Sequence, residues 1–251
     1  MFDFHHMTVI VTGSGAGMGR EAAKLFAKYG ANVVVNSLSD SAKSAQEEIA
    51  AAGGSALFVQ ADVGQESDCR RLIDETVKAY GRIDVLVNAA GIVVDGSVET
   101  AELSDWDRSM NTNVKSVFML SRFAMPYLRE TKGAIVNVAS VVAIKGVKNR
   151  AIYSATKGAM IALSQSMAAE YVGEGIRINC VSPGTVLSPS LQGRIDRTDD
   201  PEAALANFVS RQPMGRLGTS DEVAKAIVFA AGQGVGFMTG ANIVVDGGMT
   251  I

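Results

Sequence analysis

Tyr153 and Lys157 are the residues of this chain whose types and spacing most directly indicate chemistry. They lie four positions apart in AIYSATKGAMIALSQSMAAEY, a stretch whose composition favours a helix. At that spacing two side chains share one helix face, with Cβ atoms about 5–6 Å apart. A tyrosine hydroxyl titrates near ~10, and a neighbouring ammonium group lowers that pKa because it favours the phenolate. The pair can therefore exchange a proton with a substrate as a general acid and base.

Ser140 adds a second hydroxyl to this chemistry. It follows an apolar run at residues 134–139, so the sequence places it at the tip of a strand. From there its hydroxyl can hold a carbonyl oxygen beside the tyrosine. The alternative is an ordinary amphipathic helix with Tyr153 and Lys157 at its surface. The motifs in the rest of the chain distinguish a catalytic pair from a surface pair.

Three glycines near the start of the chain indicate a phosphate-binding turn. Gly13, Gly17 and Gly19 lie between a β-branched run at residues 9–12 and a helix-forming stretch at 20–29. A strand, a glycine loop and a helix in this order are typical of pyrophosphate sites. The missing side chains let the backbone approach the phosphates, and the helix N-terminus supplies N–H donors and a favourable dipole.

The residues after the second predicted strand, at 32–36, bear on the choice of cofactor. An acidic side chain there binds the ribose of NAD, whereas a basic one binds the 2′-phosphate of NADP. The chain has Ser37, Leu38 and Ser39 at this place, so no carboxylate there repels the phosphate, and the nearest cation is Lys43. We therefore expect NADP, with NAD as the alternative.

Short apolar strands alternate with helical stretches along the whole chain. After the first two, strands are expected at residues 56–60, 83–87, 134–139, 176–181 and 242–245. Strands that can be buried on both faces are typical of parallel sheets covered by helices. The sequence predicts an α/β fold: a single doubly wound Rossmann domain over residues 1–251, with a seven-stranded parallel sheet and helices on both faces. Residues 187–212, rich in charge and poor in strand signals, indicate an insertion that can act as a lid.

Composition argues against several other classes of protein. The chain has 251 residues, 47% of them hydrophobic and 20% charged, and its net charge of −3 gives no footprint for nucleic acid or an anionic membrane. No apolar run reaches the ~18 residues of a membrane span, and the first residues lack the features of a signal peptide. With two cysteines, Cys69 and Cys180, and no cluster of metal-ligating residues, we expect a reduced, cytoplasmic protein without a metal site.

Together and in order, these motifs resemble the short-chain dehydrogenase/reductase family over essentially the whole chain. The matching residues are Thr12, Gly13, Gly17, Gly19, Asp62, Val63, Asn88, Ala89, Ala90, Gly91, Asn113, Ser140, Tyr153, Lys157, Pro183 and Gly184. The resemblance implies a catalytic tetrad of Asn113, Ser140, Tyr153 and Lys157. Tyr153 would pass the proton and Ser140 would position the substrate oxygen. Lys157 would tune the tyrosine and bind the nicotinamide ribose, and Asn113 would hold a relay water.

The resemblance also implies hydride transfer between nicotinamide and a secondary alcohol or ketone. The cofactor-binding residues it implies are Gly13, Ser14, Gly17, Met18, Gly19, Ser37, Asp62, Val63, Asn88, Ala89, Gly91, Tyr153, Lys157, Pro183, Gly184, Val186 and Ser188. Asp62 would bond the adenine amino group, or would instead cap the helix that starts near residue 66. Members of the family usually form tetramers, so we expect a homotetramer built through residues 103–129 and 152–171, with the last strand in a second interface.

A narrower resemblance concerns the substrate. Segments at residues 149–153, 183–195 and 211–212 are similar to hydroxybutyrate and 2-keto-3-deoxy-fuconate dehydrogenases, which act on hydroxy or keto acids. The resemblance implies that a small acid is bound by Ser140, Tyr153, Arg150, Arg194 and Arg211. A guanidinium group suits this role because it pairs with a carboxylate through two parallel hydrogen bonds. NAD-dependent members of that group carry an Asp where this chain has Ser37.

Two other functions stay open at this level. A 3-oxoacyl carrier-protein reductase would use the same tetrad, and the arginines would then face an acidic carrier. A protein that senses the nicotinamide cofactor without turnover would bind the nucleotide alone, although it would not need Tyr153. The pattern S-x-x-K at residues 154–157 also occurs in penicillin-recognising enzymes, but the S-D-N and K-T-G elements of that fold are absent from the sequence.

Overall fold

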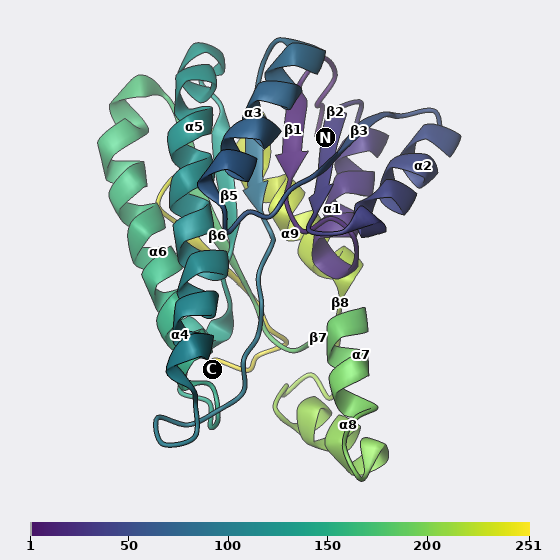
Figure 1. Cartoon of the computed structure of the whole chain (residues 1–251), viewed down its shortest axis with the longest axis vertical. Helices are drawn as coiled ribbons and strands as arrows, with labels where there is room; N and C mark the ends of the chain where they lie inside the picture. Colours follow the sequence, from purple (N-terminus) through teal and green to yellow (C-terminus); the bar gives the residue numbers. More distant parts are fainter. Residues whose placement is uncertain (1) are drawn as a thin grey trace.

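A computed structural model describes residues 2–251 and has a seven-stranded parallel sheet at its centre (Figure 1). The order across the sheet is β3-β2-β1-β4-β5-β6-β9, so the direction of winding reverses between β1 and β4. The strands of this sheet are β1 Thr8–Val11, β2 Asn32–Ser37, β3 Ser55–Gln60, β4 Val85–Asn88, β5 Ala134–Val138, β6 Arg177–Pro183 and β9 Asn242–Val245. The predicted doubly wound parallel sheet is confirmed.

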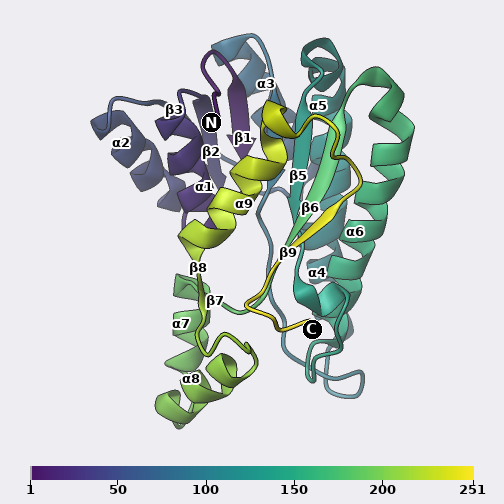
Figure 2. The ribbon, with the colours of Figure 1, turned by 180° about the vertical axis from the view of Figure 1, so that it is seen from behind.

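Helices cover both faces of the sheet, and the strand residues alternate between them. The helices are α1 Gly17–Lys28, α2 Lys43–Ala51, α3 Glu66–Tyr80, α4 Leu103–Met110, α5 Ser116–Thr131, α6 Ala151–Tyr171, α7 Pro189–Ile195, α8 Pro201–Ser210 and α9 Ser220–Ala231. Val9 and Val11 pack in the core under α1, α2 and α9, whereas Ile10 packs in the core under α3, α5 and α6. Figure 2 shows α9 and α1 from behind, on the face opposite to α5 and α6.

Residues 103–129, expected in a tetramer interface, do not form one continuous α-helix. A π-helical segment, Asn111–Lys115, separates α4 from α5, and Asn113 lies in its middle with no exposed surface. A π-bulge adds one residue to a turn, which changes the direction of the side chains around it. The helical periodicity of the sequence continues through the segment, so the bulge was not predicted.

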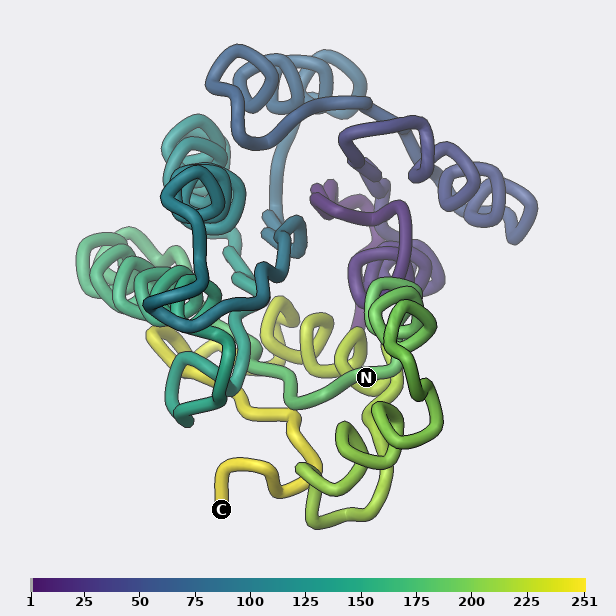
Figure 3. The backbone as a smooth tube through the Cα atoms, turned by 60° about the horizontal axis from the view of Figure 1, so that its bottom comes forward, coloured from purple at the N-terminus to yellow at the C-terminus, as the bar shows by residue number. Residues whose placement is uncertain are grey.

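The segment at 187–212 contains two short helices rather than an irregular insertion. Proline starts both α7 and α8, and the side chains of Ser188 and Asp200 cap them. A second, two-stranded sheet joins β7 Val186–Leu187 to β8 Gly218–Thr219 at the base of this segment. Figure 3 brings the carboxyl ends of the strands forward and shows α7, α8 and the C-terminal tail on that side. Within residues 2–251 no helix is both long and apolar enough to cross a membrane.

A buried carboxylate ties the start of β1 to the start of β4. Asp84 accepts a hydrogen bond from the Thr8 backbone N–H at 2.8 Å and pairs with Arg82 at 2.6 Å, although only 5% of its side chain is exposed. These contacts align the two strands between which the winding reverses. The carboxylate therefore fixes the geometry of the sheet at the point where a ligand crevice forms.

Replacing Asp84 should destabilise the fold. Asp84→Ala leaves the Thr8 N–H without its acceptor, which should lower the free energy of unfolding by about 1–3 kcal/mol. Urea denaturation at neutral pH measures this loss. Asp74→Ala is the matched control, because Asp74 is an exposed acid on α3. Equal stability of the two variants would show that the Asp84 contacts do not support the sheet.

Candidate active site

Lys157 and Tyr153 lie on the face of α6 that packs against the sheet. Lys157 is only 4% exposed, and its Nζ donates a hydrogen bond of 2.7 Å to the backbone carbonyl of Val138, the last residue of β5. The same nitrogen lies 5.7 Å from the centre of the Tyr153 ring. A buried ammonium group is stable only when it has such partners. The bond to the end of β5 therefore helps to hold α6 against the sheet, and the position of α6 determines where the Tyr153 side chain lies.

The environment shifts the pKa values of both groups. Burial lowers the pKa of Lys157 to about 8, because a charged amine is costly to remove from water. Burial also raises the pKa of Tyr153, while the Ser140 hydroxyl and, after it, Arg194 and Arg150 act in the opposite direction. The net shift for the tyrosine is upward, so the sequence-based expectation that Lys157 would lower this pKa is not met in the free protein.

Ser140 lies two residues beyond the carbonyl that holds Lys157. It has an extended backbone, caps the short 3₁₀ turn Val141–Ala143 and is 8% exposed. Ser140, Tyr153 and Lys157 line one cavity of about 230 Å³ at the carboxyl end of the sheet. The wall of this cavity also includes Gly91, Met18, Val186, Ser188, Phe208 and Met249. Two hydroxyls and an amine thus converge where a small polar molecule can enter.

Asn113 is held by protein groups rather than directed into open space. Its Oδ1 accepts a hydrogen bond of 2.8 Å from the Ile92 N–H, and its Nδ2 donates to the Ile92 carbonyl at 2.9 Å and to Thr156 Oγ1 at 3.1 Å. Both hydrogens of the amide are therefore used. Through these bonds the side chain fastens the loop after β4 to α6.

Three arginines form part of the wall of the cavity. Arg150 precedes α6, Arg194 lies in α7 and Arg211 follows α8, and all three line the cavity. The guanidinium groups of Arg194 and Arg211 lie 5.6 Å and 4.6 Å from the centre of the Phe208 ring. Burial lowers the pKa of Arg150, with Asp95 acting against this and the other two arginines adding to it. The cluster is cationic and partly removed from water.

The glycine turn between β1 and α1 lies against the loop after β4. Gly13 has a left-handed φ of 64°, and a Cβ on it would lie 2.7 Å from Ala90 Cα. A Cβ on Gly19 would lie 2.5 Å from the Gly13 carbonyl oxygen, so only glycine allows α1 to start here. Ser14 bonds Asn36 from both its backbone and its hydroxyl, which joins the turn to β2.

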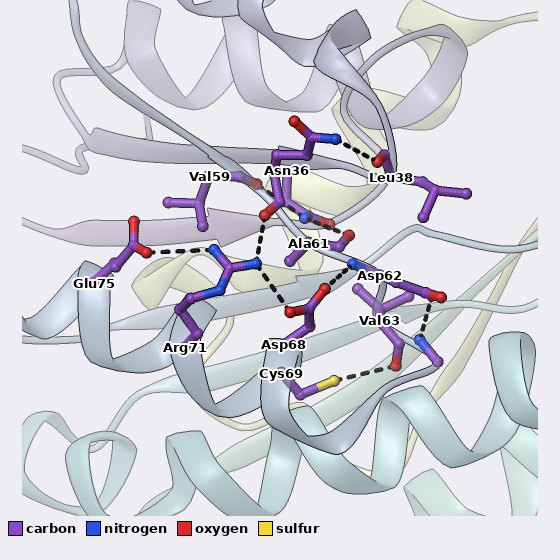
Figure 4. A network of polar contacts seen from close by, with 12 residues as sticks. Asn36, Leu38, Val59, Ala61, Asp62, Val63, Asp68, Cys69, Arg71 and Glu75 are labelled. Carbon is purple, nitrogen blue, oxygen red and sulfur yellow. Dashed lines mark hydrogen bonds and ion pairs between the residues drawn. The ribbon is translucent and has the colours of Figure 1, made fainter.

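The ends of β2 and β3 form a dense polar network (Figure 4). Asn36 Nδ2 donates to the carbonyls of Val59 and Ala61 at 3.1 Å each, and Arg71 bonds both Gln60 O and Asp68. The Asp62 carboxylate accepts from the Gly64 N–H. The predicted alternative role of Asp62 as a helix cap is wrong, because Gln65 is the N-cap residue of α3. Val63, with a carbonyl that accepts from Cys69, completes the turn.

Ser37 is bound within its own turn. It is 8% exposed, and its hydroxyl donates to the Ser39 carbonyl at 2.7 Å and accepts from the Ala42 N–H at 3.0 Å. A neighbouring cation is Arg20, which bonds Gly15 O at 3.2 Å and pairs with Glu48 at 2.8 Å. The hydroxyl of Ser37 is therefore engaged in holding the turn that follows β2.

The remaining predicted nucleotide contacts lie on the loops after β4 and β6. Thr12 Oγ1 accepts from the N–H groups of Ala89 and Ala90 at 3.1 Å, and Asn88 bonds Asn137 on β5. Gly184 follows Pro183 and bonds the Val245 carbonyl at 2.9 Å. Sequence reasoning did not single out the holding role of Thr12, nor Phe208 or Asp95. The contacts of Thr12 and Asp95 join segments far apart in the chain, so no local pattern indicates them, and Phe208 lies between Arg211, three residues on, and Arg194 on α7.

Comparison with known proteins gives several matches over nearly the full chain. A family model described as enoyl-(acyl carrier protein) reductase matches residues 13–250. An uncharacterised oxidoreductase of Thermotoga maritima is 42% identical over 99% of both chains. A meso-2,3-butanediol dehydrogenase of Serratia marcescens is 39% identical over 98% of this chain and 96% of its own. A 2-keto-3-deoxy-L-fuconate dehydrogenase of Xanthomonas campestris is 38% identical over 95% of this chain and 78% of its own.

A solved structure agrees with these sequence matches. A Burkholderia xenovorans protein described as a short-chain dehydrogenase/reductase superimposes with a TM-score of 0.96. It is 31% identical in sequence, and the match covers 100% of this chain and 98% of the other. The structural match and the sequence matches therefore agree with each other.

The lowered pKa of Lys157 predicts a pH dependence of stability. Below about pH 8 the amine is protonated in the folded and the unfolded chain, and the folded chain carries the full cost of burying the charge. Between about 8 and the ordinary value of 10.5 the unfolded chain alone holds the proton, so stability from this group rises with pH. The total gain is on the order of 3 kcal/mol.

Comparison with Lys157→Met isolates this contribution. The methionine variant has no proton to lose, so its stability relative to the wild type should fall as pH rises from 8 to 10.5. Denaturant unfolding of both proteins across this range measures the difference. A difference that stays constant with pH would show that the amine titrates at its ordinary value.

Proposed function

The chain belongs to the short-chain dehydrogenase/reductase family, and from this we propose that it oxidises or reduces a small hydroxy or keto acid with a nicotinamide cofactor. The observation that carries the proposal is the common cavity of Ser140, Tyr153 and Lys157, which three arginines also line. The tetrad supplies proton transfer, and the arginines supply an anchor for a carboxylate. The reacting carbon would lie between the two.

We assign the proton step to the Tyr153 hydroxyl. With its raised pKa the phenol is protonated at neutral pH, so it can donate a proton to a ketone oxygen. Ser140 would bond the same oxygen and hold it beside the phenol. In the opposite direction the phenolate has to accept a proton, so oxidation of the alcohol should become faster as pH rises.

The residues around the cavity fit a nicotinamide dinucleotide. Gly13 and Gly19 allow the close backbone packing that forms the turn before α1, and Gly91 leaves free the space beside Lys157 Nζ. Gly17 and Met18 at the start of α1, Val186 and Ser188 would hold the phosphates and the nicotinamide. When bound, the nicotinamide supplies or accepts the hydride. Lys157 would bond its ribose, and Asn113 would act by positioning the loop after β4.

We propose NADP as the preferred cofactor. Support comes from Ser37, which puts no carboxylate at the end of β2, and from the cations Arg20 and Lys43 in the segments around this turn. Against a 2′-phosphate, the Ser37 hydroxyl is already engaged and Arg20 is paired with Glu48. NAD therefore remains the alternative, and the assay described below compares the two.

The substrate class rests on the arginine cluster. Guanidinium groups bind carboxylates bidentately, and partial burial strengthens such pairs. A relative named for a keto acid, 2-keto-3-deoxy-L-fuconate dehydrogenase, supports this class. A relative named for a neutral diol, meso-2,3-butanediol dehydrogenase, shows that the family members similar to this chain are not restricted to acids.

A 3-oxoacyl carrier-protein reductase is the second candidate. The family model that matches the chain is described as enoyl-(acyl carrier protein) reductase, which also names an acyl carrier, and the arginine cluster would attract an acidic carrier. An acyl thioester added to the substrate panel distinguishes the two candidates. The third possibility, a cofactor sensor, predicts nucleotide binding without turnover of any member of the panel.

We further propose a homotetramer, with α4, α5 and α6 in one interface and the C-terminal strand in another. Large apolar side chains exposed on α4 and α5, among them Leu103, Trp106 and Phe118, support the first interface. Both cysteines are buried free thiols, which supports a reducing, cytoplasmic location. We also propose that residues 1–251 act as one domain, in which the segment at 187–212 is the lid.

A tyrosine variant tests the proposed function. Tyr153→Phe removes the proton donor and keeps the ring, so turnover should fall by at least about 10³-fold while nucleotide binding stays within about twofold. Absorbance of the reduced nicotinamide measures turnover, and fluorescence titration measures binding. Tyr171→Phe, the same change at the end of α6, is the control.

The substrate panel contains hydroxy acids, sugar acids, neutral alcohols and an acyl thioester, each with NADP and with NAD. Turnover of acids with NADP is the expected result. Undiminished turnover in Tyr153→Phe would contradict the role of the phenol. Binding of nucleotide without turnover of any compound would favour the sensor.

A further inference from the structure

An acidic side chain already occupies the arginine cluster. Asp95, in the loop between β4 and α4, places its Oδ1 2.5 Å from Arg150 Nη1 and 3.7 Å from Arg194 Nη2. The Arg150 side chain is only 11% exposed, whereas the Asp95 side chain is 59% exposed. The carboxylate therefore reaches the buried guanidinium from the solvent side, where a substrate carboxylate would also arrive.

The backbone holds Asp95 at this position. Gly96, the next residue, forms a short parallel bridge with Arg150: its N–H donates to the Asn149 carbonyl, and its carbonyl accepts from the Ala151 N–H, both at 3.2 Å. The loop and the start of α6 thus stay together. Because the bridge uses backbone atoms alone, the Asp95 side chain can rotate away from the arginines while the loop remains in place.

One carboxylate does not satisfy the cluster. Among the described residues, Arg194 Nε is buried and has no hydrogen-bond partner, although Nε and Nη2 together form the edge that binds a carboxylate with two bonds. Two of the three guanidinium groups, those of Arg150 and Arg194, pair with Asp95, and within residues 2–251 Arg211 has only the Asn207 amide oxygen as a side-chain hydrogen-bond partner. The arrangement therefore has an exposed, exchangeable anion and an unfilled donor edge beside it.

We propose that Asp95 is an internal counter-ion of the arginine cluster, which an acidic substrate displaces when its carboxylate binds Arg150 and Arg194. This inference rests on the proposed function, because it assumes that the cluster binds the carboxylate of an acid. It assigns to Asp95 a role in specificity that the tetrad does not have.

The counter-ion weakens the preference of the enzyme for acids over neutral alcohols. An acid has to compete with a tethered carboxylate that is always nearby, so its apparent affinity is reduced. A neutral alcohol leaves the Asp95–Arg150 pair intact, so the cluster does not remain with unpaired buried charges. A chain with this acid in place can accept both classes, whereas removing it should restrict the chain to acids.

Butyrate binding tests the counter-ion without requiring turnover. Butyrate carries the carboxylate of a small hydroxy acid but no reactive hydroxyl, and butyramide is its neutral counterpart. Saturation-transfer NMR titrations give dissociation constants for the wild-type chain and for Asp95→Asn, with Asp95→Ser as a second variant that lacks the amide oxygen. Glu99→Gln is the control, because it removes one negative charge from an exposed position on the same loop.

We expect butyrate to bind about three- to fivefold more tightly to both Asp95 variants. This change in the dissociation constant corresponds to the free energy of a partly exposed ion pair. Butyramide binding and the Glu99→Gln variant should show no gain, and Arg150→Ala should abolish the gain in the Asp95→Asn background. Unchanged or weaker butyrate binding in the Asp95 variants, an equal gain in Glu99→Gln, or no butyrate binding to any of the proteins would overturn the proposal.

The same titrations separate this inference from the proposed function. If the substrate panel shows turnover but butyrate affinity is unchanged in the Asp95 variants, the counter-ion role of Asp95 is rejected and the proposed oxidoreductase function stands. If butyrate affinity increases in the Asp95 variants but no compound is turned over, the counter-ion role of Asp95 is supported and the proposed oxidoreductase function is contradicted.

Discussion

The burial of one ammonium group is the constraint on which the site depends. Lys157 is surrounded by protein and needs an acceptor, and the carbonyl at the end of β5 provides it at 2.7 Å. This bond sets the position of α6 relative to the sheet. Tyr153 then lies one helical turn before the amine, and Ser140 lies two residues after the accepting carbonyl. Together with the Asn137–Ser164 hydrogen bond and the apolar packing of α6, this contact brings three polar side chains to one cavity.

Other polar contacts hold the loops around this cavity. Asn113 fastens the loop after β4 to α6, Thr12 holds the same loop to β1, and Ser14 joins the glycine turn to β2. Each uses a buried side chain to satisfy backbone groups that the loops leave unpaired, which is the usual condition for irregular backbone near a sheet. These hydrogen bonds join the loops on one side of the site, whereas α7 and α8 on the other side are short helices with exposed residues.

The sequence predicted the sheet and the placement of the main motifs because both follow from local patterns. Alternating strands and helices give the doubly wound sheet, and the spacing of Tyr153 and Lys157 gives their common helix face. The π-helical segment at Asn113 was missed because its residues continue a helical pattern. The upward pKa shift of Tyr153 depends on burial, and the pairing of Asp95 with Arg150 depends on a bridge between residues 54 positions apart in the chain. Neither has a signal in the local sequence.

The most direct measurement of the central claim is the structure of the full chain crystallised with NADP. The account predicts that the nicotinamide ring lies in the cavity between Gly91 and the Tyr153–Ser140 pair, with its ribose within hydrogen-bond distance of Lys157 Nζ. A nicotinamide bound elsewhere, or a Tyr153 hydroxyl that points away from the ring, would contradict the account.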